Sequence, residues 1–283
     1  MTSAHPLPLG PAPRPTTGDD LADRLRALAT RAAGAGVAGL DRARVTATLE
    51  GADVATLEAD LTGVAFGGAQ QKAPGVGWQP GTITAREDGT VRRLRVDAHP
   101  LTAVDLPVDV TAEAEGLRFT WVEGADGQVG FEPVEPDDTH PVTGHARVAV
   151  SRAGLVATVH GLLAVSLQSQ GITLSDLDVQ LDSHGPRAAG LRIEAKIRKG
   201  FLSAGVSATA SASVDAAMVL TVGDVRISSG NPLVAAMLGA VRGRVEAAAN
   251  RRIDLAAALP PGVRLADVRL DVGEELVLTA RLG

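Results

Sequence analysis

The 283-residue sequence contains no cysteine and no tyrosine, and aromatic residues make up only 2% of it. Without cysteine the chain has no disulfide, no thiolate nucleophile and no zinc–thiolate site. Aromatic side chains normally form the largest packing units of a core and the stacking platforms for bases, so this core must be built from Leu, Val, Ile and Ala. A net charge of −6 also disfavours a nucleic-acid partner, because phosphate binding depends on clustered Lys and Arg.

The sequence also has little that would direct it into a membrane. Residues 1–20 are rich in proline and carry no long apolar run, so we predict neither a signal peptide nor a membrane anchor. Residues 203–222 are the best candidate for a membrane span, but they contain Asp215 and many Ser and Thr residues, unlike a transmembrane helix. Together with the absence of cysteine, this predicts a soluble, cytoplasmic protein whose membrane contact, if any, is peripheral.

The first half of the chain is expected to hold a short leader, one helix and several strands. Residues 1–18 contain five prolines and are predicted to be a disordered leader to a single domain over residues 19–283. A helix is expected from about Asp19, with an apolar stripe of leucines, ending at the glycines of residues 34–39. Alternating residues predict strands from position 44 onward, with Glu87-Asp88-Gly89 as a turn between two of them.

The second half is more regular. It is expected to contain a helix over residues 155–166, a meander of four strands, a helix from Asn231 to Arg252, and two closing strands over residues 263–282. The valines of residues 155–166 also permit a strand there. The four strands are placed at residues 176–182, 191–198, 203–214 and 218–227. Their strict alternation predicts an antiparallel sheet with one face in water and one face covered.

The covered face of the strand over residues 203–214 is almost entirely alanine. In one interpretation the small side chains let a helix approach the sheet closely. In the other they leave an apolar space that an acyl chain could fill, because a large empty cavity would be costly. The pattern itself leaves both interpretations open.

Two groups of residues resemble a dinucleotide site and a metal site, but a helix terminator and a solvated acidic loop explain them better. Gly34-Ala-Gly36-Val-Ala-Gly39 matches the dinucleotide fingerprint, yet it follows a helix, whereas a pyrophosphate site needs these glycines between a strand and a helix. Asp137, Asp138, His140 and His145 lie in a proline-rich loop without the supporting groups of a metal site. No nucleophile–base pair and no Gly-x-Ser-x-Gly elbow appears, so we predict no enzyme, no cofactor and no metal.

Basic residues gather at one expected hairpin tip. Arg192, Lys196, Arg198 and Lys199 follow the water-facing side of one expected strand to the tip of a hairpin, where Phe201 and Leu202 come next. A solvated outer face is the simpler explanation. The alternative is a tip that contacts an anionic membrane surface through Arg198, Lys199, Phe201 and Leu202, where each cation contributes about 1 kcal/mol.

The order of elements, and the stretch Leu259-Pro-Pro-Gly-Val-Arg-Leu within residues 253–283, resemble the bacterial phospholipid-binding family named after the lipomannan elongation factor of actinobacteria. The likeness covers residues 20–283 and extends to the tubular lipid-binding superfamily. It implies an α+β fold in which a long curved antiparallel sheet wraps around one or two long helices. It also implies a non-enzymatic protein that holds acyl chains. Relatives usually carry an envelope signal, which residues 1–20 lack.

The leading hypothesis is therefore a lipid carrier or sensor that binds acyl chains between helix and sheet. The residues expected to contact the lipid are taken from the apolar faces: Val159, Leu163, Ile197, Ala208, Ala210, Met237, Leu238 and Val241. The rival hypothesis is a structural or protein-interaction module with a filled core that acts as a homodimer.

Overall fold

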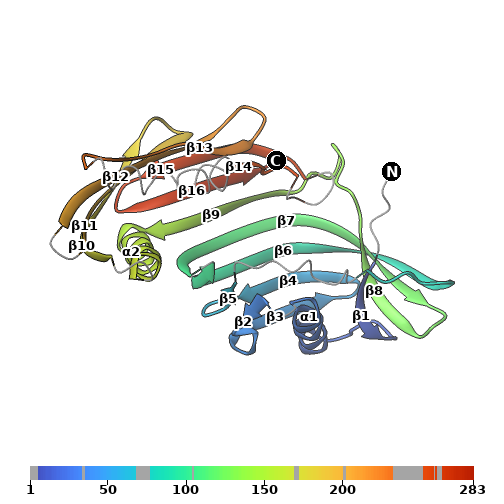
Figure 1. Cartoon of the computed structure of the whole chain (residues 1–283). Coiled ribbons are helices and arrows are strands. Elements are labelled where there is room, and N and C mark those ends of the chain that lie inside the picture. Colours follow the sequence, from blue (N-terminus) through green and yellow to red (C-terminus); the bar gives the residue numbers. More distant parts are fainter. Residues whose placement is uncertain are drawn as a thin grey trace. The chain divides into compact units, whose positions relative to one another are not determined.

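The structure is a computed structural model of the chain, and it describes residues 6–33, 36–67, 77–103, 105–168, 172–199, 202–231, 251–257, 259 and 263–283 (Figure 1). Strands account for 63% of it and helices for 13%. In the described residues there are two α-helices, α1 (Gly18–Ala32) and α2 (Arg152–Gln168). The predicted α+β class, with a sheet wrapped around long helices, is therefore wrong: the fold is predominantly β, because most of the chain is committed to strand pairing.

The strands form two sheets. Counted over the described residues, the larger has eleven strands, with the main order β15-β16-β9-β7-β6-β4-β3, and the smaller has five in the order β10-β11-β12-β13-β14. The chain divides into two compact units, residues 1–148, 259–266 and 280–283, and residues 149–258 and 267–279. That residues 19–283 fold as a single domain stays a prediction.

The N-terminal unit contains most of the larger sheet. Its strands are β1 (Leu7–Pro11), β2 (Val37–Ala38), β3 (Arg44–Glu50), β4 (Asp53–Asp60), β5 (Ala65–Phe66), β6 (Ile83–Ala103), β7 (Leu106–Gly124), β8 (Gln128–Pro133) and the first part of β9 (Thr143–Ser151). Most pairs are antiparallel, but β4 and β5 both run parallel to β6. Strands β2 and β3 flank a 3₁₀ turn, η2 (Leu40–Arg42).

Helix α1 forms as the sequence predicts. The Thr17 hydroxyl accepts a hydrogen bond from the Asp20 N–H and caps the first turn, where acidic residues also favour the positive end of the helix dipole. Leu21 is fully buried, and Leu25 and Leu28 pack beside it against the core of the sheet. The helix ends at Ala32, and the described part of the glycine-rich motif contains β2 and ends at Gly39, directly before η2.

The core of the N-terminal unit is mostly aliphatic, as predicted, but it also contains a cluster of three aromatic rings. The rings of Phe119, Trp121 and Phe131 meet with centroids 4.5–5.2 Å apart, two of the pairs edge to face. The Trp121 indole N–H donates to the carbonyl of Ala52 at 2.8 Å, so the one polar atom of this side chain is satisfied. Three of the chain's few aromatic side chains therefore pack together in one cluster.

The predicted turn at residues 87–89 is wrong. Strand β6 runs without interruption through Glu87-Asp88-Gly89, which pair with Trp121, Thr120 and Phe119 of β7. A Cβ on Gly89 would lie 2.7 Å from the Phe119 ring and 2.5 Å from the Ala52 carbonyl oxygen. Glycine is needed at this position for close packing, not for a turn.

The predicted disordered leader is also wrong for the part that the structure describes. Residues Leu7–Pro11 form β1, which pairs antiparallel with β8. Leu9 is 2% exposed and belongs to the core cluster. Arg14 then ties the segment down, because its guanidinium binds the Glu87 carboxylate and the Gly51 carbonyl and lies over the Trp121 ring.

The C-terminal unit contains α2 and the five-stranded sheet. The strands of that sheet are β10 (Thr173–Ser183), β11 (Ala188–Lys199), β12 (Leu202–Val214), β13 (Val219–Ser229) and β14 (Arg251–Asp254). Consecutive strands pair antiparallel, which confirms the predicted four-strand meander. The closing strands, β15 (Leu265–Val272) and β16 (Glu275–Leu282), are confirmed too, and parts of them belong to each unit.

One end of the predicted last helix is wrong. Arg251 and Arg252, expected in its final turn, lie in β14 and pair with Val222 and Thr221 of β13. The backbone groups of β13 offer hydrogen bonds to residues 251–254, and this strand pairing outweighs the helix propensity of the segment. The rest of that helix prediction, residues 232–250, lies outside the described residues.

Candidate functional site

The five-stranded sheet has one apolar and one polar face, as the alternation predicts. On β11, Leu191, Ile193, Ala195 and Ile197 are buried or half-buried, while the residues between them are exposed. The same alternation holds along β10, where Val179 and Leu181 are buried. The apolar face is therefore a continuous surface across neighbouring strands.

Strand register gives this surface a defined profile. Val179 of β10 pairs with Ile193 of β11, Ile193 with Ala208 of β12, and Ala208 with Ile227 of β13. Directly paired residues project from the same face, so small β12 side chains lie between larger ones on β11 and β13. Ala208 and Ala210 are only half-buried, so this strip of small residues is partly accessible.

Helix α2 packs beside the sheet against β10. Apart from Arg152 at its start, His160 and Gln168 at its end, its seventeen residues are apolar or small and uncharged on all sides, a pattern usually found in fully buried helices. Yet the described side chains of α2 are at most half-buried: Leu155, Val156 and Val159 are intermediate, and Ala153 and Ala157 are exposed. None of the helices in the described part of the chain is long and apolar enough to cross a bilayer.

The structure places part of the predicted lipid-contact set on these two surfaces. Ile197, Ala208 and Ala210 lie on the apolar face of the sheet, and Val159 lies half-buried on α2. The side chain of Leu163, and the whole of Met237, Leu238 and Val241, lie outside the described residues. The lipid site between helix and sheet therefore remains a prediction.

The predicted membrane-contact tip is described only in part. Arg198 is exposed on the polar face of β11, opposite Ser203. Lys199 pairs with Leu202 at the end of the β11–β12 hairpin, but the side chains of both, and Phe201, lie outside the described residues.

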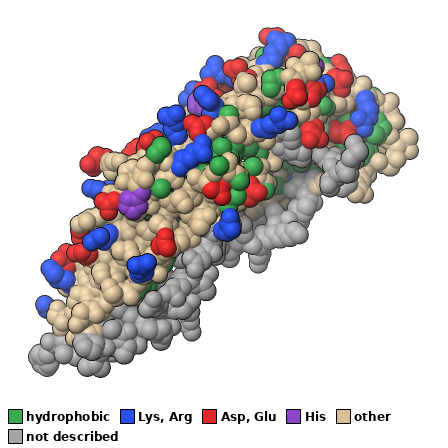
Figure 2. Space-filling model, turned by 90° about the horizontal axis from the view of Figure 1, so that it is seen from above, with side chains coloured by type: hydrophobic (Ala, Val, Ile, Leu, Met, Phe, Trp, Pro, Cys, Tyr) green, Lys and Arg blue, Asp and Glu red, His purple; other side chains and the backbone are tan. Residues whose placement is uncertain are grey.

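Charges of both signs share the polar surface. Figure 2 shows Lys and Arg side chains interspersed with Asp and Glu on the face it displays. Lys196 and Asp176 form an ion pair at 3.0 Å across β11 and β10. Near the start of β15, hydrogen bonds from Arg187 and Arg269 lower the pKa of Asp267 below its usual value. These contacts are typical of a solvated outer face.

In the loop that contains Asp137, Asp138 and His140, the acidic side chains have structural partners. The Asp137 carboxylate accepts hydrogen bonds from the backbone N–H groups of Thr139 and His140, and these bonds lower the pKa of Asp137. Asp138 faces Arg264 at 3.5 Å. Among the residues with described positions, no three His, Asp or Glu side chains are grouped as metal ligands would be.

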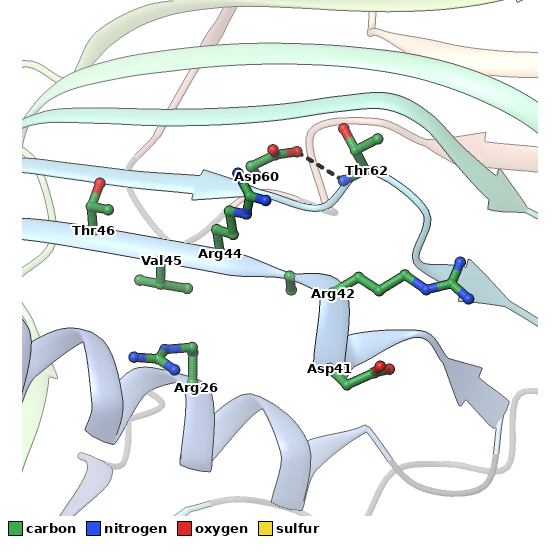
Figure 3. Close-up of a pocket in the computed structure, with 9 residues that line it drawn as sticks. Arg26, Asp41, Arg42, Arg44, Val45, Thr46, Asp60 and Thr62 are labelled. Atoms are coloured by element: carbon green, nitrogen blue, oxygen red, sulfur yellow. Dashed lines mark hydrogen bonds between the residues drawn. The ribbon is translucent and has the colours of Figure 1, made fainter.

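Sequence reasoning missed a polar pocket of about 790 Å³ in the N-terminal unit (Figure 3). Its charged lining is Arg26 from α1, Asp41 and Arg42 from η2, Arg44 from β3 and Asp60 from β4. Figure 3 shows Arg44 beside Asp60, Arg26 rising from the helix, and Arg42 extending from the turn. Only the neighbouring Arg42 and Arg44 could have suggested a basic site from sequence.

Comparisons of the chain with protein-family models, with curated proteins and with solved structures find no match. The likeness to the actinobacterial phospholipid-binding family therefore remains a resemblance of the sequence pattern.

Proposed function

We propose that the protein is a non-enzymatic lipid-binding protein, and that acyl chains bind on the apolar face of β10–β13 next to α2. The observation that carries this proposal is the accessibility of the apolar residues of α2. A helix with so few polar side chains would normally be buried, but the described side chains of α2 are half-buried or exposed.

The sheet supports the same proposal. Ala208 lies between Ile193 and Ile227, and all three are half-buried. An acyl chain laid along the alanine strip would contact branched side chains on both sides, and each buried CH₂ group would contribute about 0.8 kcal/mol. No ionisable side chain projects from the apolar face along β11, where the alternate positions are Leu191, Ile193, Ala195 and Ile197.

The proposal is tested by Ala208→Asp, with Thr209→Asp as the matched control. Ala208 projects from the apolar face, whereas Thr209 lies on the polar face between Arg192 and Arg226, where a carboxylate is well placed. An unpaired charge beneath a hydrocarbon chain costs several kcal/mol, so Ala208→Asp should weaken uptake of a fluorescent fatty acid by about ten-fold or more. Thr209→Asp should bind like the parent protein.

Lipid analysis of protein purified gently from its own host provides the second measurement, by native mass spectrometry. Bound lipid is expected in the parent protein and a reduced amount in Ala208→Asp. Protein that carries no lipid and takes up no fatty acid would refute the proposal.

The rival function, a protein-interaction module that acts as a dimer, is favoured by a different observation. Ala153, Ala157 and Gly161 recur every fourth residue on the exposed side of α2, and a Cβ on Gly161 would meet no atom within 4 Å. Small residues at this spacing permit close approach of a second helix. Sedimentation over a range of concentrations distinguishes the two functions, because a stable dimer of lipid-free protein supports the rival.

A further inference from the structure

The pocket in the N-terminal unit differs from the rest of that unit in how its arginines are partnered. Across the described residues between positions 6 and 148, every other arginine side chain takes part in an ion pair, a hydrogen bond or another polar contact. Among those described residues, the guanidinium groups of Arg42 and Arg44 form neither a hydrogen bond nor a salt bridge, and both side chains line this pocket.

The two guanidinium groups approach the same loop from different elements. The Arg42 side chain lies beside Gly63, and Arg44 lies beside Asp60, which precedes that loop (Figure 3). Arg26, from α1, borders the pocket from another side, with its charge shared with Asp23. A guanidinium group binds phosphate or carboxylate through two parallel N–H bonds. Two guanidinium groups that line one pocket and form no hydrogen bond with the described residues therefore favour an anionic ligand.

The acidic residues of the lining restrict which anions fit. Hydrogen bonds from the Thr62 hydroxyl and backbone N–H, with a contribution from the charge of Arg44, lower the pKa of Asp60 and keep it ionised. Asp41 is exposed and has no hydrogen bond or ion pair among the described residues. A ligand with only anionic groups would be repelled by these carboxylates, whereas hydroxyl groups would donate hydrogen bonds to them.

We propose that this pocket binds a phosphate ester of a sugar or another polyol, with the phosphate on Arg42 and Arg44 and hydroxyl groups on Asp41 and Asp60. A cavity of about 790 Å³ has room for such a ligand, and far more room than a single phosphate ion requires. The ligand is either a free solute or the headgroup of a lipid, since both present the same chemistry. The proposal goes beyond acyl binding and does not depend on it.

Calorimetric titration of the full chain with glucose 6-phosphate, with inorganic phosphate and with glucose tests the chemistry. Glucose 6-phosphate should bind more tightly than either fragment, and binding should weaken with added salt. Arg42→Gln and Arg44→Gln should each reduce affinity about ten-fold or more, the scale of one lost charge-assisted contact. Arg192→Gln is the matched control: it removes the same charge from a side chain on the polar face of the other unit, and it should have no effect.

Two further measurements define the ligand and its source. Asp41→Asn should leave affinity for inorganic phosphate unchanged or higher and should remove the advantage of the sugar phosphate. Flotation compares binding of the protein to phosphatidylglycerol vesicles and to phosphatidylcholine vesicles. If the protein binds phosphatidylglycerol vesicles through Arg42 and Arg44 but binds glucose 6-phosphate weakly, the ligand is a lipid headgroup and not a free sugar phosphate.

The proposal is overturned if neither the sugar phosphate nor the vesicles bind. It is also overturned if an Arg42→Gln, Arg44→Gln double variant with an unchanged circular dichroism spectrum binds as well as the parent. The double variant should still take up a fluorescent fatty acid, so failure of this site is distinguishable from failure of the acyl site.

Discussion

Replacing Trp121 by phenylalanine tests how the core of the N-terminal unit is held together. Trp121 is 1% exposed, and its indole N–H donates to the carbonyl of Ala52. The substitution leaves that carbonyl without its donor, which costs about 1–3 kcal/mol. It also removes roughly 40 Å³ of side chain, and at about 24 cal/mol per Å³ the void adds about 1 kcal/mol. We expect the free energy of unfolding to fall by about 2–4 kcal/mol.

The assay is urea denaturation followed by far-ultraviolet circular dichroism. Trp78→Phe is the control, because the Trp78 indole N–H donates to the exposed carboxylate of Asp126, which water can solvate after the change. This variant also leaves Trp121 as the sole tryptophan, so its fluorescence reports the unfolding of the N-terminal unit. The packing argument is refuted if Trp121→Phe loses less than about 1 kcal/mol, or no more than Trp78→Phe.

Two further predictions concern the same unit. Gly89→Ala should lower the free energy of unfolding by about 1–3 kcal/mol, because its Cβ would lie 2.5 Å from the Ala52 carbonyl oxygen, whereas Gly81→Ala, with no atom within 4 Å, should change it little. A similar loss in both variants would contradict the close-packing explanation. The second prediction concerns pH: a hydrogen bond from Arg92 lowers the pKa of Asp53 in the folded state, so this carboxylate stabilises the fold above its ordinary pKa of 3.8 and loses that effect as the pH falls through its folded pKa. Asp53→Asn should therefore flatten the acid limb of a plot of unfolding free energy against pH, and an unchanged acid limb would show that the pair contributes nothing.

The apolar half of the candidate site could be predicted because strand alternation is a local property. Ile197, Ala208 and Ala210 were assigned to one face from a period of two residues, and the structure places them there. The arginine pocket could not be predicted in the same way. Arg26 and Asp60 are brought to Arg42 and Arg44 by the packing of α1 and the pairing of β3 with β4, and neither contact has a signal in the spacing of the residues.

The sequence by itself determined the elements whose pattern is strong over many residues, namely α1 and the meander β10–β13, whereas the pattern of α2 permitted either a helix or a strand. Tertiary structure decided the segments whose local signal is weak or points the other way. Gly89 resembles a turn residue, but the Phe119 ring takes the space that a side chain would need and β7 continues the ladder. Residues 7–11 resemble a proline-rich leader but pair with β8, and residues 251–254 resemble the end of a helix but pair with β13. In each case a distant strand supplied the hydrogen bonds, and local propensity, worth a fraction of a kcal/mol per residue, was outweighed.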